Sequence, residues 1–324
     1  RRIESEDTTP AILLPFEGST VKEHFMRRTL RRWLVGGWLA HLACAPPHAH
    51  VPPARVELGA ALTVAPDDAY FAKPLPFDAR VHVGKLANGL TYFVLPHPKP
   101  RQRAQLWLAV NAGSVLEDDD QRGLAHFVEH MAYNGTNKFE RLEIVNYLER
   151  IGMQFGPDIN AYTSFDQTVY QLTVPTDSDE IVSRGLDILR QWAGEVAFDP
   201  KELEKERGVV LEEWRQGRGA WARIEDKQFG VLFEGSRYAT RLPIGEPAII
   251  KGAPRAAITR FYRDWYRPNL MAVIAVGDFD AAKLTAAIQA RFADLENPPG
   301  APARPVVAVA RHEETQISID TDPE

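Results

Sequence analysis

Two histidines and a glutamate at helical spacing constrain this chain more than any other feature. Residues 126–130 are HFVEH, and residues three or four apart lie on one face of an α-helix. His126 and His130 therefore project together, and Glu129 overhangs the same face. The two residues between them are apolar, which predicts a buried helix, and buried histidines beside a buried carboxylate require a compensating partner. The fold must enclose this helix and satisfy its polar face.

Such a polar face can bind a metal ion. Imidazole suits zinc, and a catalytic zinc usually has three protein ligands and one open position. His126 and His130 supply two ligands. Glu129 can take a proton from a water that the metal acidifies and pass it to a leaving amine. The alternative, which these five residues do not exclude, is a surface helix that binds no metal.

A third ligand has to come from another part of the chain. Residues 199–216 predict a second helix, because Asp199 is a favourable N-cap and Pro200 suits the first helical position. Glu206 and Glu213 lie seven residues apart, hence two turns apart on one face. One of them could bind the metal while the other orients a histidine. Glutamate-rich helices are also common on solvated surfaces, so this support is weak by itself.

The rest of the pattern predicts an α+β fold with an antiparallel or mixed β-sheet packed with helices. Strands and helices follow one another without regular βαβ alternation. The acidic run 117–120 is a natural helix start, because carboxylates there accept backbone N–H bonds. Strands are expected at 81–83, 90–95, 105–110, 159–174, 271–276, 306–310 and 316–319, and helices at 122–133, 142–151, 178–196, 199–216, 258–265 and 281–292.

The N-terminal part differs in composition from the rest. Residues 26–32 are basic, the apolar stretch 33–43 is too short to span a bilayer, and small residues and prolines follow. This order is typical of a secretory signal peptide. We therefore expect an extension and signal peptide in residues 1–44, a Pro/Ala-rich linker in 45–78, and export to a bacterial periplasm. The alternative is a basic, apolar tail without a function.

Cys44 is the only cysteine in the chain. A single cysteine excludes an intramolecular disulfide and any multi-cysteine zinc site. Cys44 lies where a bacterial lipoprotein would be cleaved and lipidated, but His41 replaces the aliphatic residue expected before that site. Lipidation is thus an alternative to simple export, and a lipid anchor at Cys44 is the only membrane contact we expect.

Composition excludes other classes of protein. The 324 residues are 44% hydrophobic and 25% charged, which is typical of a soluble globular protein. The length allows one large domain or two ordinary ones. The net charge is −6, and no basic block is long enough to suggest nucleic acid as a partner.

Four blocks in a fixed order resemble the insulinase/pitrilysin family of zinc metallopeptidases. Residues 123–136, GLAHFVEHMAYNGT, are similar to its zinc-binding segment, whose His-x-x-Glu-His inverts the order found in thermolysin-like enzymes. The likeness covers most of the chain after the linker. The other blocks are 156–166 (GPDINAYTSFD), 198–213 (FDPKELEKERGVVLEE) and 243–245 (PIG).

The resemblance implies a zinc-dependent endopeptidase with one Zn²⁺ per chain. His126 and His130 match the family's histidine ligands, and Glu129 matches its general base. Glu213 matches the distal glutamate ligand, and Glu206 matches the glutamate that supports a ligand. These assignments are expectations carried over position by position.

Two further assignments follow from the resemblance. Glu212 is the alternative to Glu213, although helical phase with Glu206 favours Glu213. Asn160 and Ala161 match the edge strand on which family members align a peptide through backbone hydrogen bonds, and this mode implies extended peptides or unfolded proteins as substrates. The alternative for Asn160 is that its side chain only satisfies a turn.

The resemblance also implies a domain arrangement. The family fold is a half-clamshell of two repeated α+β units, so we expect the catalytic domain at 79–300 and the start of an incomplete second domain at 301–324. In the family a later domain supplies an Arg/Tyr pair that helps to bind substrate, so a second insulinase-type domain or subunit is an expected partner. The main alternative is a catalytically silent peptide-binding or structural subunit of an insulinase-type heteromer.

Overall fold

The structure is a computed structural model that describes residues 77–322. The expected signal peptide, nearly all of the expected linker and Cys44 lie outside the described residues. Within residues 77–322, no helix combines the length and the apolar character needed to cross a membrane.

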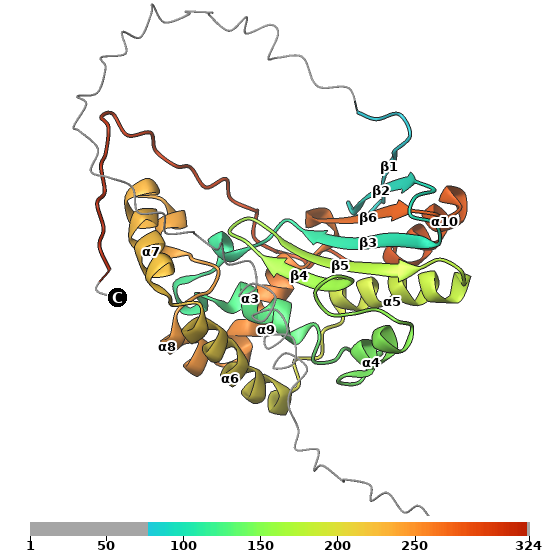
Figure 1. Cartoon of the computed structure of the whole chain (residues 1–324), viewed down its shortest axis with the longest axis horizontal. Helices are drawn as coiled ribbons and strands as arrows, with labels where there is room; N and C mark the ends of the chain where they lie inside the picture. Colours follow the sequence, from blue (N-terminus) through green and yellow to red (C-terminus); the bar gives the residue numbers. More distant parts are fainter. Residues whose placement is uncertain (1–76, 323–324) are drawn as a thin grey trace, which may run out of the picture. The chain divides into compact units, whose positions relative to one another are not determined.

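Within the described residues, six strands form one mixed sheet (Figure 1). The strands are β1 (His82–Lys85), β2 (Thr91–Pro96), β3 (Arg103–Val110), β4 (Ile159–Thr163), β5 (Thr168–Pro175) and β6 (Met271–Gly277). Their order in the sheet is β1-β2-β6-β3-β5-β4. Neighbours are antiparallel except for the parallel pair β2–β6. Strand β4 therefore lies at one edge of the sheet.

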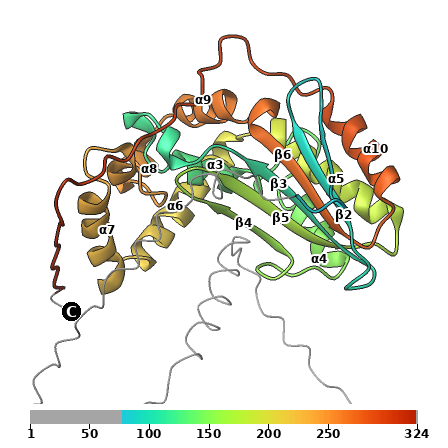
Figure 2. The same cartoon turned by 90° about the horizontal axis from the view of Figure 1, so that it is seen from above.

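Helices cover one face of this sheet. In β3 and β6, buried residues alternate with exposed or half-buried ones, as expected when only one face carries the core. Against that face pack α3, α5 and α10, while α6 and α9 lie beside α3 (Figure 2). The helices are α3 (Leu124–Met131), α4 (Glu143–Arg150), α5 (Asp179–Gly194), α6 (Pro200–Gln216), α7 (Ala220–Leu232), α8 (Pro247–Gly252), α9 (Arg255–Trp265) and α10 (Ala281–Phe292).

Most of the predicted elements are confirmed, including the N-cap of α6. The Asp199 side chain accepts hydrogen bonds from the backbone N–H groups of Lys201 and Glu202, and Pro200 is the first residue of the helix. The α+β class with a mixed sheet is likewise confirmed.

The predictions differ from the structure in the last segment, and two helices, α7 and the short α8, were not predicted. Residues 301–322 form no strand, although strands were expected at 306–310 and 316–319. A strand needs a hydrogen-bonded neighbour, and no described segment pairs with this one. Helix α7 was not predicted. It follows Gly217 and Gly219, which indicate a break in helical structure, and no N-cap side chain marks its start.

Candidate metal centre

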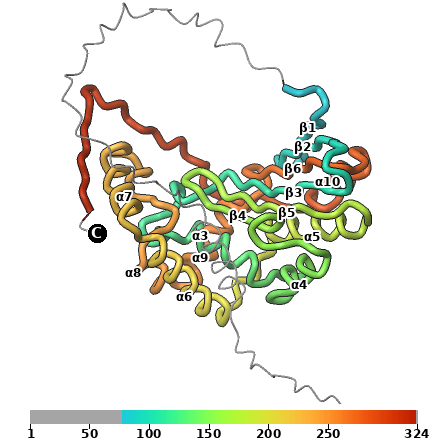
Figure 3. The backbone as a smooth tube through the Cα atoms, in the orientation of Figure 1, coloured from blue at the N-terminus to red at the C-terminus, as the bar shows by residue number. Residues whose placement is uncertain are grey.

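Helix α3, which carries the HFVEH segment, is enclosed by the surrounding elements. All of its residues except His126 are buried, and the side chain of His126 is 12% exposed. The helix contacts β4, α6 and α9, which come from distant parts of the sequence (Figure 3). The predicted burial of this helix is confirmed.

A buried carboxylate holds the beginning of α3. Glu117 is fully buried, and its carboxylate accepts hydrogen bonds from the backbone N–H of Gly123, 3.0 Å from each oxygen, and of Ala125, at 2.8 Å. It thereby satisfies N–H groups that the first turn of a helix leaves unpaired. Burial raises the pKa of Glu117 to about 8, against the opposing effect of these hydrogen bonds and of Arg241. The expected role of the acidic run is thus confirmed for Glu117.

The block 243–245 packs against the same end of α3. Gly123 and Gly245 both have left-handed backbone conformations, with φ values of +98° and +73°. They approach so closely that a Cβ atom on Gly245 would lie 2.2 Å from the Cα of Gly123. Next to this contact, the N–H of Glu246 donates to the carbonyl of Arg122 at 3.2 Å. Only glycine fits here, which gives this block a structural role beside the motif helix.

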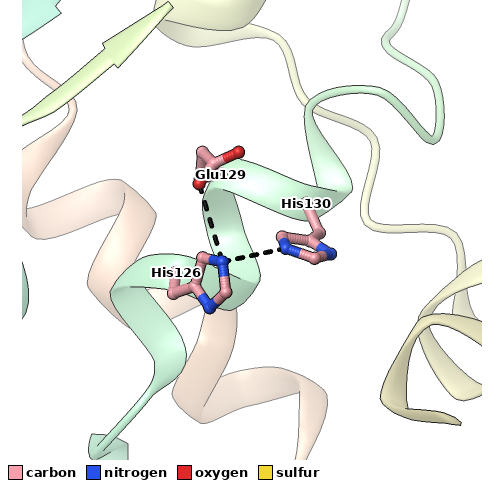
Figure 4. A group of neighbouring side chains, drawn as sticks. All are labelled: His126, Glu129 and His130. Carbon is pink, nitrogen blue, oxygen red and sulfur yellow. Dashed lines mark hydrogen bonds and ion pairs between the residues drawn. The ribbon is translucent and has the colours of Figure 1, made fainter. Parts of the chain in front are cut away.

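His126 and His130 direct their Nε2 atoms at one another (Figure 4). The two atoms are 3.0 Å apart. This separation is close to the distance of about 3.3 Å between two nitrogens that are both bound at about 2.0–2.1 Å to one tetrahedral zinc. Glu129 Oε2 lies 3.8 Å from His126 Nε2, and ligand atoms of all three residues lie within 4.8 Å of one another. One helix therefore brings the three polar groups together.

Glu213 reaches the same point from α6. Its Oε1 lies 3.8 Å from His126 Nε2 and its Oε2 lies 3.5 Å from His130 Nε2. The carboxylate of Glu212, the alternative, instead binds the side chains of Arg215 and Gln216, whose hydrogen bonds lower the pKa of Glu212 to about 2. Of these two glutamates, the structure brings Glu213 to the histidines.

Glu206 contacts Nδ1 of His130, the ring nitrogen that does not face His126. It is 5% exposed, and its Oε1 lies 2.7 Å from His130 Nδ1. A carboxylate accepts hydrogen bonds, so the proton of the neutral ring is held at Nδ1 and the lone pair of Nε2 faces the centre. The other carboxylate oxygen accepts a hydrogen bond from Asn134 Nδ2 at 2.8 Å. The ring of His130 is thus fixed in the tautomer that binds a metal.

The donor set fits a zinc ion. Two imidazole nitrogens and one carboxylate are ligands of a known class of catalytic zinc site. Because Glu206 fixes the proton of the His130 ring at Nδ1, the lone pair of His130 Nε2 faces His126 Nε2. A cation between these two nitrogens would stabilise this arrangement. The Nδ1 of His126 is buried and has no hydrogen-bond partner among the described residues.

Asn160 and Ala161 lie on the edge strand β4. Ser164 N–H donates to Gln167 O at the hairpin turn, so the even-numbered residues of β4 bond to β5 and the odd-numbered ones face outward. Ile159 follows this pattern, since its backbone bonds to the loop at 154–156. The outward N–H of Ala161 is capped by Asn160 Oδ1 at 2.9 Å.

Sequence reasoning missed two side chains that touch this centre. Asn134 contacts Glu206, and its Nδ2 also lies 3.3 Å from the carbonyl of His130. Its position four residues after His130 could have indicated this contact. Thr163 Oγ1 donates to Glu129 Oε2 at 3.3 Å. Nothing in the local sequence shows that this strand passes Glu129.

Two family models match the chain. Insulinase (Peptidase family M16) matches residues 92–228, and Peptidase M16 inactive domain matches residues 253–324. The chain belongs to the insulinase family of peptidases. The family resemblance expected from the four sequence blocks is confirmed.

Other members of the insulinase family are similar to this chain. It is 45% identical over 250 residues to "Zinc protease PQQL-like" of Arabidopsis thaliana, covering 77% of this chain and 26% of that relative. It is 44% identical over 224 residues to "Probable zinc protease PqqL" of Haemophilus influenzae, covering 69% and 24%. The chain spans about a quarter of the length of these relatives.

A solved structure shows the same fold. The crystal structure of the first half of the periplasmic protease PqqL from Escherichia coli superposes with a TM-score of 0.70 at 36% sequence identity. The match covers 74% of this chain and 51% of that one. The names of these insulinase-family relatives indicate zinc and proteolysis as the chemistry of the family.

Proposed function

We propose that this chain carries the zinc centre of an endopeptidase that hydrolyses extended peptides or unfolded proteins. One observation carries the proposal. The Nε2 atoms of His126 and His130 converge with the carboxylate of Glu213, and Glu129 lies beside them. This set of groups suits metal-assisted hydrolysis.

Each residue has a distinct part in binding one Zn²⁺. His126 and His130 would bind it through Nε2, and Glu213 through its carboxylate. Glu206 would hold His130 in the binding tautomer through Nδ1, where it lies at 2.7 Å. When bound, zinc would supply a Lewis acid that polarises the peptide carbonyl and acidifies an attacking water.

Glu129 is proposed to move the proton. It is 4% exposed, and its Oε2 faces the point where the histidines converge. From there Oε2 would accept a proton from the attacking water and return it to the leaving nitrogen. The general-base role of Glu129 thus rests on its place beside the ligands.

The edge of β4 is the proposed binding site for the peptide backbone. Ala161 and Thr163 direct their backbone groups toward the open edge. A peptide carbonyl could replace Asn160 Oδ1 as the partner of the Ala161 N–H. Pairing of this kind binds main chain rather than particular side chains, so it suits extended chains of varied sequence.

The complete activity is proposed to need more than the described domain. We propose a catalytic domain at residues 79–300 and the start of a second domain at 301–324. Three apolar side chains of that last segment, Val306, Ile317 and Ile319, are 80–94% exposed. Their exposure supports packing against a second insulinase-type domain or subunit, which would remove this apolar surface from water.

The cellular location is a further proposal. The similar Escherichia coli protein is described as a periplasmic protease. Together with the signal-like order of residues 26–47, this supports export to a bacterial periplasm. Lipidation at Cys44 stays an untested alternative.

The proposal is tested by Glu129→Gln in the full chain. The variant should keep one zinc per chain, because Glu129 is not one of the proposed ligands. Cleavage of an unfolded polypeptide should fall about 10²–10⁴-fold, the usual contribution of a general base. Metal analysis and a fluorescent peptide assay provide the two measurements.

Glu212→Gln is the matched control, because it removes a neighbouring carboxylate that points away from the histidines. Unchanged cleavage by zinc-loaded Glu129→Gln would refute the proposed mechanism. A wild-type chain that binds zinc and peptide but never turns over, even with a second insulinase-type domain added, would support the silent peptide-binding subunit.

A further inference from the structure

Thr163 connects the open edge of the sheet with Glu129. Its backbone belongs to the outward-facing residues of β4. Its side chain lies on the helix-covered face of the sheet, opposite the buried Thr168 of β5. From that face Thr163 Oγ1 lies 3.3 Å from Glu129 Oε2. One residue therefore faces the proposed peptide with its backbone and the proposed base with its hydroxyl.

The direction of this hydrogen bond follows from chemistry. An ionised carboxylate can only accept, so the hydroxyl proton of Thr163 points at Glu129. The oxygen of Thr163 also lies 3.5 Å from Thr168 Oγ1, which donates its own proton to the buried carbonyl of Ala112 at 3.0 Å. The β-branched side chain of Thr163 has few rotamers, so its hydroxyl is held in this direction.

The hydrogen bond between Thr163 and Glu129 is long enough to shorten when a substrate binds. At 3.3 Å, the distance between Thr163 Oγ1 and Glu129 Oε2 exceeds the usual 2.5–3.0 Å for an O–H···O hydrogen bond. Hydrogen bonds among catalytic groups are often long before substrate binds and shorten in the complex. A peptide that pairs with β4 would order the edge strand that carries Thr163.

We propose that Thr163 is a positioning residue, whose hydroxyl holds the carboxylate of Glu129 and couples it to peptide pairing at the edge of β4. This inference rests on the proposed function, because it assumes that Glu129 moves the proton and that β4 receives the peptide. Thr163 itself takes no part in bond making or breaking.

Thr163→Val tests the role of the hydroxyl in the full, zinc-loaded chain. Valine keeps the shape and favours a strand, but it cannot donate. Loss of one hydrogen bond to a charged group should lower kcat about 10-fold. The KM and the zinc content should stay unchanged, because the peptide-pairing backbone and the ligands are intact. Thr163→Ser, which keeps the hydroxyl, should restore most of kcat.

Thr173→Val is the matched control. Thr173 lies on β5, on the face opposite to Thr168, and its hydroxyl makes no hydrogen bond among the described residues. This variant should cleave at the wild-type rate. A wild-type kcat in Thr163→Val would overturn the inference. So would Thr163→Ser being as slow as Thr163→Val, or loss of zinc from Thr163→Val.

A second measurement is independent of turnover. Crystal structures of the wild-type chain, Thr163→Ser and Thr163→Val should show one Glu129 conformer in the first two and a displaced or divided carboxylate in the third. An identical, fully ordered Glu129 in all three would overturn the inference. If the wild-type chain cleaves no peptide even with a second insulinase-type domain added, the proposed function fails by itself, and this measurement still decides whether Thr163 positions Glu129.

Discussion

The two glutamates that α6 presents to α3 lie in opposite environments. The side chain of Glu206 is 7% exposed, and both of its carboxylate oxygens have partners, at 2.7 Å from His130 Nδ1 and 2.8 Å from Asn134 Nδ2. Two turns later, the side chain of Glu213 is 39% exposed, and its oxygens lie 3.5 and 3.8 Å from the two Nε2 atoms. One face of the first part of α6 is thus buried, whereas the last turns of the helix contain no buried residue.

The packing of α6 explains this difference. Its buried residues are Leu203, Glu206, Arg207 and Val210, all in the first two-thirds of the helix. Arg207 donates to the carbonyls of Ile250 and Ala253 in and after α8, which fixes this part of α6 in place. Glu206 is therefore held by His130 and Asn134, whereas Glu213, as the proposed ligand, would have to approach the histidines more closely to bind a metal. The proposed supporting residue and the proposed ligand thus lie two turns apart on one helix.

The largest effect should come from Glu213→Ala. Without this carboxylate, only two histidines would hold the ion, fewer than the three protein ligands usual for a catalytic zinc. Zinc affinity should fall by more than about 100-fold, beyond the loss typical of a supporting residue. Competition with a chromophoric chelator measures it, with Glu212→Ala as the neighbouring control. Equal affinities for the two variants would contradict the division of roles along α6.

A smaller effect is expected from Glu206→Gln. Glutamine can still accept from His130 Nδ1, but the charge is lost and its amide would face the amide donor of Asn134. Zinc affinity should fall about 10–100-fold, as for other partners of ligating histidines. The same competition assay applies. A loss greater than that of Glu213→Ala would reverse the comparison.

A separate effect concerns the stability of the fold rather than zinc affinity, and it depends on pH. The pKa of Glu117 is about 8 in the folded protein against 4.5 for an exposed carboxyl. Between these two pH values the Glu117 carboxyl is protonated in the folded state and ionised in the unfolded state. The free energy of unfolding should therefore fall as pH rises, by about 1.4 kcal/mol per pH unit. Below 4.5 this stabilisation is fully present, and above about 8 it is lost.

Glu117→Gln should remove this slope, because an amide does not titrate. Urea unfolding at several pH values measures it. Asp120→Asn, at an exposed carboxylate of the same acidic run, should leave the slope unchanged. A slope that persists in Glu117→Gln would assign it to other groups.

Local spacing made the two helices of the centre predictable. His126, Glu129 and His130 share a face because they are three and four residues apart, and Glu206 and Glu213 because they are seven apart. The approach of α6 to α3 is not encoded in either spacing. That step rested on the family resemblance, and the structure brings the two helices together.

Contacts between distant segments were not predictable in the same way. The hydroxyl of Thr163 meets Glu129 only because β4 passes α3 in the folded chain. The expected strands at 306–310 and 316–319 failed for a related reason. Their apolar residues fit a strand. A strand, however, forms only where its backbone is hydrogen-bonded to a neighbouring strand, and no described segment pairs with these residues.

The most direct test of the metal centre is a crystal structure of the zinc-loaded chain with diffraction data on both sides of the zinc absorption edge. We expect one anomalous peak per chain, about 2.0–2.2 Å from the Nε2 atoms of His126 and His130 and from a carboxylate oxygen of Glu213. Glu129 should lie beside the ion without binding it. A peak elsewhere, or a zinc ion held by the histidines with Glu213 turned away, would contradict the proposed centre.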